Sequence, residues 1–304
     1  MKLKNKFLSL FLIVIFAIST LVGCGNKTET MTDREGNSFK LPQKINTIIS
    51  TAPSNTEILV GLGLSDKLAA IDKYSTDVDG VNKDLPKIDF KNPDAETLVS
   101  LKPDLIIASG HNKTGSEDPF AAVKEAGIPV VYIPTSSSIE DLYKDIDFIS
   151  KITGTEKKGN EMITNMKDDI SSIKKIGDTI TNKKNVYFEI GSTSSLYSFG
   201  NNTFLNEMIE IVGAKNIFAN ENSWISPNPE YIVKANPDVI LTNEPTGNAV
   251  INIKNREGFK DVTAVKENNV FAIDNNSSSR PSQNIIKALK QMAKAIYPEE
   301  YSNV

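Results

Sequence analysis

The chain has 304 residues, a length that predicts two domains at about 150 residues per domain. Hydrophobic residues make up 39% of the chain and charged residues 24%, which excludes a collagen-like, coiled-coil or wholly disordered protein. With 34 basic and 38 acidic side chains, the net charge of −4 gives no electrostatic footprint for nucleic acid. One cysteine and one histidine exclude an intramolecular disulfide, a cysteine-based zinc site and any multi-histidine metal site.

The N-terminus has the pattern of a secretory leader. Three lysines within the first six residues precede an uncharged apolar run at 7–22, which predicts a signal peptide over residues 1–23. This run is shorter than the roughly 20 residues of a spanning helix. The segment Leu21-Val22-Gly23-Cys24 resembles the lipobox of bacterial lipoproteins. That resemblance implies a lipid anchor on Cys24, a tether over 24–38, and a location on the extracytoplasmic face of the cell membrane. An uncleaved anchor helix and an ordinary cleaved signal are the alternatives.

Beyond the tether, short apolar runs rich in β-branched residues alternate with helical patterns. The runs that predict strands lie at 44–50, 105–108, 130–133, 186–190, 239–241 and 270–273. Alternation of strands with helices predicts an α/β fold with largely parallel sheets. After the first strand, Ser54 and Glu57 have the spacing of a capping box for a helix that ends at Gly63.

The two halves of the chain resemble each other. The segment at 92–107 recurs at 228–241, with a glutamate, a Pro-Asp pair and an aliphatic strand in the same register 134 residues apart. Two further matches occur in the same order, of 57–63 with 207–213 and of 130–133 with 270–273. Three matches in one order predict two similar α/β lobes, at 39–153 and 181–304.

Between these lobes, hydrophobic residues recur at the spacing of helices. Ser138 can cap a helix that ends at Gly154, and a second helix follows from Glu156 to Ile176. At about 1.5 Å per residue, the second helix is on the order of 30 Å long. The segment 154–180 is therefore predicted to be a single, stiff bridge between the lobes.

A family resemblance emerges from these motifs in their order along the chain. The motifs are Ala52-Pro53-Ser54-Asn55-Thr56-Glu57-Ile58-Leu59, the repeated Pro-Asp segment, Gly213-Ala214-Lys215-Asn216-Ile217-Phe218 and Ser279-Arg280-Pro281. Together they resemble the cobalamin and iron-complex binding proteins, which are substrate-binding subunits of ABC importers. The resemblance covers roughly Thr30 to the C-terminus. It implies two α/β lobes joined by one long helix, with a ligand cleft between the lobes.

The same resemblance implies how the protein works. It would be a monomeric receptor that performs no chemistry, uses no cofactor of its own and delivers its ligand to permease subunits in the membrane. The ligand would be a cobalt or iron chelate, either cobalamin or a ferric siderophore, with haem as an alternative ligand of the same fold.

Three aromatic residues are candidates for the walls of the cleft. Large ring ligands favour aromatic walls, because aromatic side chains bury much area at little cost in entropy. Trp224 is the only tryptophan, and the resemblance implies that its loop faces the cleft. Tyr74 follows the strand-like run at 69–71 in the first lobe, and Tyr197 follows the predicted strand at 186–190 in the second. The alternative is that all three belong to the core or its rim.

Polar candidates for ligand binding are Arg280, His111 and Ser109. Arg280 offers a planar fork for carboxylate, phosphate or catecholate groups, although it can also be a surface residue before a helix. The chain has three arginines in all, too few for a separate arginine triad around an anionic siderophore. Ser109 and His111 follow the strand at 105–108, at the end where α/β folds bind ligands. His111 can contact the ligand or coordinate its metal axially; a lone surface histidine is the alternative.

Glu96 and Glu230 occupy equivalent positions of the repeat, each in the first turn of a predicted helix. The helix dipole stabilises a carboxylate in the first turn by about 0.3–1 kcal/mol. This stabilisation does not explain why both lobes have a glutamate at the same position of the repeat. In the family, a glutamate on each lobe pairs with arginines of the two permease subunits. The resemblance implies that role for Glu96 and Glu230.

Two other classes of protein are disfavoured. An extracellular hydrolase is disfavoured because the segment Gly191-Ser192-Thr193-Ser194-Ser195 lacks the Gly-x-Ser-x-Gly spacing. A catalytic triad would also have to use His111, the only histidine in the sequence. A receptor for bare zinc or manganese would need several histidine ligands.

Overall fold

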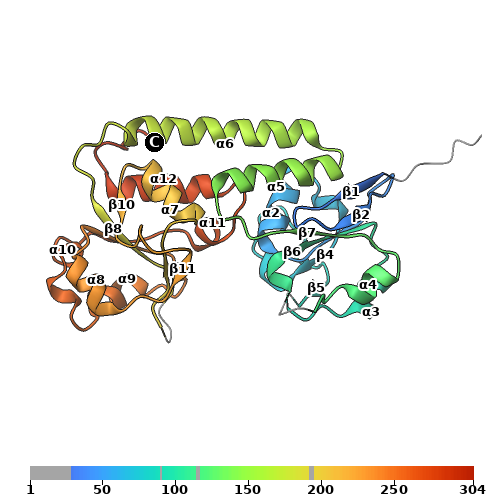
Figure 1. Cartoon of the computed structure of the whole chain (residues 1–304), viewed down its shortest axis with the longest axis horizontal. Helices are drawn as coiled ribbons and strands as arrows, with labels where there is room; N and C mark the ends of the chain where they lie inside the picture. The colour runs from blue at the N-terminus through green and yellow to red at the C-terminus, as the bar shows by residue number, and fades with distance from the viewer. Residues whose placement is uncertain (1–28, 90, 114–116, 192–194) are drawn as a thin grey trace, which may run out of the picture.

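The computed structural model describes residues 29–304 except residue 90 and residues 114–116 and 192–194. Two α/β lobes lie side by side beneath one long helix, α6 (Glu156–Gly177) (Figure 1). The predicted signal peptide and Cys24 lie outside the described residues. Among the helices of the described part, none combines the length and the apolar character needed to cross a bilayer.

The first lobe is built on a five-stranded parallel sheet of order β5-β4-β3-β6-β7. These strands are β3 (Ile48–Ser50), β4 (Leu68–Asp72), β5 (Lys87–Ile88), β6 (Leu105–Ser109) and β7 (Val130–Ile133). Helices cover both faces: α2 (Pro53–Gly61) and α5 (Ile139–Ile152) on one side, α3 (Ala95–Ser100) and α4 (Ala121–Glu125) on the other. Along β6, Leu105 and Ile107 join the core on the α2 side, whereas Ile106 and Ala108 join the opposite core. Burial on both faces explains why this strand is apolar without alternation.

The second lobe has a four-stranded parallel sheet of order β10-β8-β12-β13. Its strands are β8 (Asn185–Glu189), β10 (Lys215–Asn216), β12 (Val239–Thr242) and β13 (Val270–Ala272). The helices that cover it are α7 (Phe204–Ile211) and α12 (Ile285–Ile296) on one face, and α8 (Pro229–Ala235), α9 (Ala249–Lys254) and α10 (Thr263–Lys266) on the other. A short antiparallel pair, β9 (Ser198–Phe199) with β11 (Trp224–Ile225), and the helix α11 (Asn275–Ser279) complete the lobe.

The strand orders confirm the predicted two similar lobes. With β5 left out, the first sheet has the order β4-β3-β6-β7, and the second has the order β10-β8-β12-β13. In both sheets, the strand that comes second along the chain lies at one edge, followed by the first, the third and the fourth. The first lobe adds one edge strand, β5, which has no counterpart in the second sheet.

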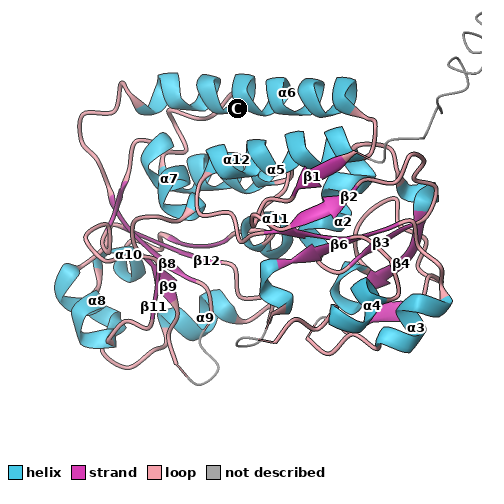
Figure 2. Ribbon diagram, turned by 45° about the vertical axis from the view of Figure 1, so that its right-hand side comes forward, coloured by secondary structure: helices cyan, strands magenta, loops and turns pink. Residues whose placement is uncertain are grey.

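The helical bridge forms as the sequence predicts. The Ser138 hydroxyl accepts the N–H of Asp141 at 3.0 Å and so caps α5, and Gly154 ends the turn after α5 with a φ of +67°. The 22 residues of α6 span about 33 Å at 1.5 Å per residue. Its buried Met166 and Ile173 belong to one apolar core that also includes residues of both lobes. The bridge is therefore packed against both lobes along its length (Figure 2).

The first residues of the described chain are not a free tether. β1 (Thr30–Thr32) pairs antiparallel with β2 (Ser38–Lys40). In the turn between them, the buried Asp33 accepts the N–H of Tyr132 at 2.9 Å, and Arg34 forms an ion pair of 2.6 Å with the buried Asp145. The prediction of a tether that runs to residue 38 was wrong, because these polar residues have partners about a hundred positions away that local sequence does not indicate.

The predicted capping box at Ser54 was also wrong. Helix α2 begins at Pro53, and its N-cap Ala52 has no side-chain cap. Proline is favoured at the first helical position, where its missing N–H costs nothing. The carboxylate of Glu57, which the box would need, is turned toward the second lobe.

The end of α6 meets the end of α7 at two glycines. Gly213 has a φ of +86°, and a Cβ there would lie 2.5 Å from the carbonyl oxygen of Gly177. A left-handed conformation costs a residue with a Cβ about 1–2 kcal/mol, and the overlap adds to that cost. Gly213→Ala is therefore expected to lower the free energy of unfolding in urea by about 2 kcal/mol or more. Gly191→Ala is the control, since a Cβ there meets nothing within 4 Å; equal effects of both changes would contradict this account.

Candidate functional site

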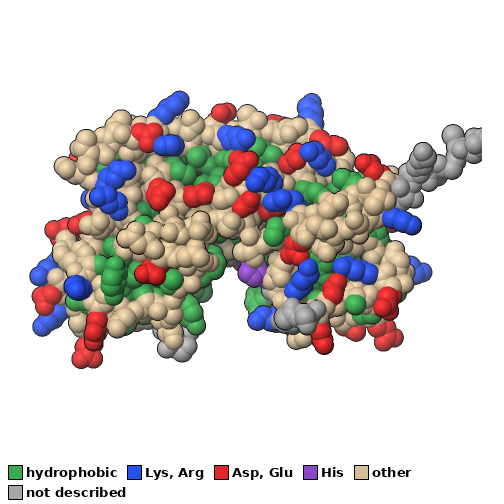
Figure 3. Space-filling model, viewed as in Figure 1, with side chains coloured by type: hydrophobic (Ala, Val, Ile, Leu, Met, Phe, Trp, Pro, Cys, Tyr) green, Lys and Arg blue, Asp and Glu red, His purple; other side chains and the backbone are tan. Residues whose placement is uncertain are grey.

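A cavity of about 370 Å³ lies where the two lobes meet, opposite α6. In Figure 3 the molecule is hollowed between the lobes on this side, with purple histidine atoms on the wall of the hollow. The first lobe contributes Ala52, Pro53, Ser54, Tyr74, Ser109, His111, Pro134 and Thr135, and the second contributes Phe204, Trp224, Asn275, Ser279, Arg280 and Pro281. A concave site between two lobes is a common place for a ligand.

Two of the three predicted aromatic residues line this cavity from opposite lobes. Tyr74 lies in a turn directly after β4, where the Asp72 carboxylate accepts its N–H at 2.8 Å, and its side chain is 56% exposed. Trp224 is 48% exposed and contacts Phe199 edge-on, with ring centroids 6.1 Å apart. Tyr197 is absent from the residues that line the cavity, and its backbone forms a bridge with Gly191. The cavity therefore has one exposed aromatic side chain from each lobe.

Ser109 and His111 lie at the carboxyl end of β6, and both line the cavity. The Ser109 hydroxyl accepts the N–H of His111 at 3.2 Å, and His111 Nε2 lies 2.8 Å from Thr135 Oγ1. Partial burial of the ring, and then the positive charge of Lys91, lower the pKa of His111. The imidazole is therefore neutral at pH 7.

A second cavity of about 320 Å³ adjoins the first and shares His111, Thr135 and Trp224 with it. Its remaining lining consists of hydroxyl and amide side chains: Ser136, Ser137, Asn202, Thr203 and Ser223. These five residues were not among the candidates predicted from the sequence. Thr135 could have been found, because it lies just beyond the predicted strand at 130–133, at the same sheet edge as His111.

Arg280 lines the cavity, but both terminal nitrogens of its guanidinium donate to groups within the protein. Its guanidinium lies 3.2 Å from a carboxylate oxygen of Glu57 and 2.9 Å from one of Asp77, and it donates to the carbonyl of Tyr74 at 3.1 Å. Only 13% of the Arg280 side chain is exposed. All three partners belong to the first lobe, so Arg280 links the second lobe to the first.

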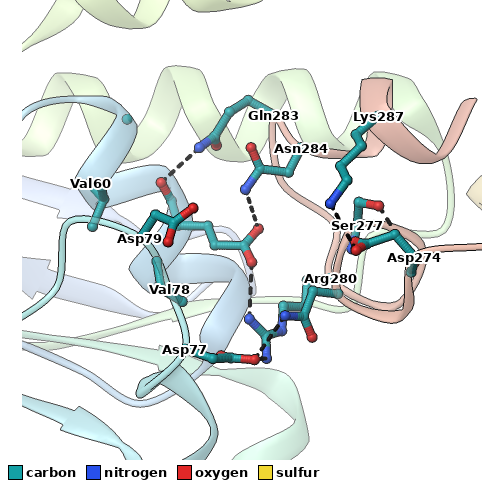
Figure 4. Close-up of a pocket in the computed structure, with 13 residues that line it drawn as sticks. Val60, Asp77, Val78, Asp79, Asp274, Ser277, Arg280, Gln283, Asn284 and Lys287 are labelled. Atoms are coloured by element: carbon teal, nitrogen blue, oxygen red, sulfur yellow. Dashed lines mark hydrogen bonds and ion pairs between the residues drawn. The ribbon is translucent and has the colours of Figure 1, made fainter. Parts of the chain in front are cut away.

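Glu57 is the centre of this link between the lobes. Its buried carboxylate also accepts hydrogen bonds from the Ser282 hydroxyl and, at 2.9 Å, from the side-chain amide of Asn284. Gln283 donates to the Glu57 carbonyl at 2.8 Å. Figure 4 shows the contacts of Arg280, Gln283 and Asn284 around a third cavity of about 280 Å³, with Arg280 on its wall. Hydrogen bonds to a charged acceptor are about twice as strong as neutral ones, so this carboxylate holds the lobes together.

The repeat-related glutamate makes a reciprocal contact. Glu207 in α7 of the second lobe accepts the N–H of Ile139 at 2.8 Å, at the start of α5 on the first lobe. Glu57 in α2 likewise contacts the segment that leads into α12 of the second lobe. The sequence indicates that these two glutamates correspond, but not that each reaches across to the other lobe.

Glu96 and Glu230 lie on α3 and α8, both exposed. The residues that cap the two helices correspond as well: Asp94 accepts the N–H of Thr97 at 3.0 Å, and Asn228 accepts that of Glu230 at 2.9 Å. Both helices lie on the side of their lobes away from α6, the side on which the cleft opens (Figures 1 and 3). The two glutamates therefore lie on corresponding helices, one on each lobe.

A metal-ion site built from the protein alone is not present in the part of the chain that the structure describes. No group of three or more His, Cys, Asp and Glu side chains there could hold a metal ion.

Two parallel-sheet lobes, one long connecting helix and a cleft between the lobes define a two-lobed solute-binding protein. Residues 48–277 match the model of the periplasmic binding protein family, and the chain belongs to that family. The match confirms the resemblance and the fold class that the sequence analysis predicts.

Known proteins match most of the chain. It is 32% identical to the uncharacterized ABC transporter substrate-binding lipoprotein YvrC of Bacillus subtilis, over 95% of this chain and 96% of that protein. It is 24% identical to a vitamin B12-binding protein of Vibrio parahaemolyticus, over 81% of this chain and 88% of that protein. A solved structure of a possible iron-binding (periplasmic solute-binding) protein from Staphylococcus epidermidis is 32% identical, with a TM-score of 0.75 over 84% of this chain and 100% of that one.

Removal of the Glu57 carboxylate should destabilise the protein strongly. Glu57→Ala leaves Arg280, Ser282 and Asn284 without their shared acceptor, and breaking a buried charge pair from one side costs about 3 kcal/mol. The free energy of unfolding in urea measures this loss. Asp261→Ala serves as a control, because its ion pair with Lys266 is exposed and its removal should have no measurable effect. A Glu57→Ala protein as stable as the control would contradict the assigned link.

Proposed function

We propose that this protein captures a bulky metal chelate, cobalamin or a ferric siderophore, outside the cytoplasmic membrane and delivers it to an ABC importer. The observation that carries the proposal is the pair of exposed aromatic residues, Tyr74 and Trp224, which line one cavity from opposite lobes. Large exposed aromatic side chains at a concave site provide apolar area for a planar or globular ring system.

The relatives support this choice of ligand class. The vitamin B12-binding protein of Vibrio parahaemolyticus and the possible iron-binding protein of Staphylococcus epidermidis both carry a metal-related ligand in their names. The lack of a protein-built metal cluster among the described residues also favours a ligand that brings its metal already chelated.

Haem is the second candidate, and one observation favours it. His111 lines the cavity with a lowered pKa, and a neutral imidazole is the form that ligates iron. Its Nε2 would have to exchange the contact with Thr135 for the metal.

Catalysis is not part of the proposal. The His111 imidazole contacts the hydroxyl of Thr135, whereas a hydrolytic triad needs a serine hydroxyl in that place. In the serine-rich segment 191–195, residues 192–194 lie outside the described residues.

The proposal includes how the receptor is held and where it docks. Cys24 would carry the lipid anchor that keeps a monomeric receptor at the outer face of the membrane. Glu96 and Glu230 would pair with arginines of the two permease subunits. Their exposure on corresponding helices of the two lobes supports this role, because rim charges set the orientation and rate of docking more than its affinity.

Trp224→Ala should weaken binding of the chelate about 30-fold, since loss of a central aromatic contact typically costs about 2 kcal/mol. Isothermal titration calorimetry with cyanocobalamin, a panel of ferric siderophores and haemin measures the affinity and identifies the ligand. Tyr197→Ala is a matched control, because Tyr197 is equally exposed but does not line the cavity. If the two variants bind the ligand equally well, the aromatic cleft is not the binding site. If no chelate binds the unaltered protein, the proposed function is wrong.

Replacing both Glu96 and Glu230 by arginine should leave ligand affinity within two-fold and reduce uptake by cells at least ten-fold, since like charges would then meet at the permease. Uptake of the radiolabelled ligand measures the effect. The control replaces Glu161 and Asp168 by arginine, which makes the same change of charge on the exposed side of α6. Normal uptake by the Glu96/Glu230 variant would refute the docking assignment.

A further inference from the structure

The ligand cleft is almost free of charge. Among the described residues that line the two adjoining cavities, Arg280 is the one permanently charged side chain, and no lysine or carboxylate joins it. His111 is neutral at pH 7 because burial and Lys91 lower its pKa. Apart from Lys91, which acts on His111 from outside the lining, the charge that a ligand meets in the cleft is set by Arg280 and by the carboxylates that contact it.

Two carboxylates of the first lobe lie behind Arg280. Glu57 contacts one end of its guanidinium at 3.2 Å, and both carboxylate oxygens of Asp77 contact the other end, at 2.9 and 3.1 Å. Asp77 is held in place by Asn276, which donates to it at 2.8 Å. Partial burial tends to raise the pKa of Asp77, but the hydrogen bonds from Asn276 and Arg280 outweigh that effect and lower it. Asp77 is therefore ionised at neutral pH.

This arrangement changes what Arg280 can offer to a ligand. An arginine with free donors attracts carboxylate, phosphate or catecholate groups through its planar fork. Here both terminal nitrogens of Arg280 donate within the protein, one to Glu57 and the other to Tyr74 and Asp77, and its single positive charge is opposed by two negative charges close to the cleft wall. An anionic group in the cleft would have to compete with Asp77 and Glu57 for the guanidinium and would be repelled by both carboxylates.

The wall of the second cavity has complementary chemistry. Ser136, Ser137, Asn202, Thr203 and Ser223 carry hydroxyl and amide groups, which both donate and accept hydrogen bonds. Such a lining can satisfy amide or hydroxyl groups at the edge of a large ligand without a counter-charge.

We propose that Asp77 is a specificity-determining counter-ion: by occupying Arg280 from outside the ligand cavity, it makes the cleft select chelates with an uncharged, amide- or hydroxyl-bearing rim over anionic chelates. This inference rests on the proposed function, because it assumes that the cleft binds a metal chelate. Asp77 acts through Arg280 and does not itself line the ligand cavity.

The test compares ligands that differ only in the charge of the rim. One pair is cyanocobalamin and its monocarboxylic acid, in which one amide of the corrin rim is a carboxylate. The other pair is haemin dimethyl ester and haemin. Calorimetry on the full receptor without its leader gives both affinities of a pair, and their ratio is the quantity of interest. The unaltered protein should bind the uncharged member at least ten-fold more tightly.

Asp77→Asn keeps the shape of the side chain and removes its charge. The variant should bind the anionic member about ten-fold more tightly than the unaltered protein does, with the affinity for the uncharged member changed less than two-fold. Asp79→Asn is the matched control: Asp79 lines the same third cavity, and no contact between it and Arg280 is seen. This control should leave the ratio unchanged, which separates the effect of Asp77 from a general loss of negative charge.

The possible outcomes separate this inference from the proposed function. A protein that binds one of the pairs without preference, or prefers its anionic member, overturns the inference while the function stands. An unchanged ratio in a folded Asp77→Asn protein, or an equal change in both variants, also overturns it. If Asp77→Asn fails to fold, the ratio for the unaltered protein still decides, since a preference below three-fold contradicts a charge-selective cleft. If neither pair nor any siderophore binds, the proposed function fails, and this inference with it.

Discussion

A buried carboxylate at the junction of the lobes determines most of what the cleft can do. Glu57 accepts hydrogen bonds from three side chains of the segment 280–284 and so fixes the second lobe against the first. A buried charge is tolerated only when such partners surround it, because desolvation of an unpaired carboxylate is costly. The position of Arg280, and through it the charge of the cleft wall, follows from this one requirement.

Two kinds of contact hold the lobes together: the apolar core beneath α6, and the hydrogen bonds of Glu57 and Glu207. The chain crosses between them once, through α5 and α6, and the apolar core beneath α6 is continuous with the cores of both lobes. On the cleft side of that core, the contacts are polar and reciprocal, with Glu57 and Glu207 each reaching to the opposite lobe. Apolar contacts do not depend on direction, whereas hydrogen bonds do. The core therefore keeps the lobes together, and the two glutamates set their orientation.

Much of this architecture could be predicted from sequence, for physical reasons that are local. The strands at 130–133 and 239–241 are continuous apolar runs, since both faces of their sheets are covered, and the cap at Ser138 lies next to the helix that it starts. The placement of Ser109 and His111 in the cavity follows from the rule that parallel strands present ligand residues at their carboxyl ends.

The features that could not be predicted depend on distant partners. Asp33 is paired with a backbone group 99 positions away, and Arg280 with Glu57 at a separation of 223 positions. Nothing beside Glu57 in the sequence distinguishes a helix-capping carboxylate from one that binds another lobe. The position of Tyr197 outside the cavity likewise depends on how β9 and β11 pair. Strands of two residues are too short for their pairing to be predicted from sequence.

The correspondence of strand order between the lobes has a consequence for how a guest molecule is seated. A receptor made of two identical halves would present the same surface to both faces of a disc-shaped ligand, and the ligand could bind in either orientation. Here one wall carries a tyrosine and a histidine and the other a tryptophan and an arginine. A guest with two chemically different faces therefore meets an asymmetric slot, and one direction of insertion is favoured over its reverse.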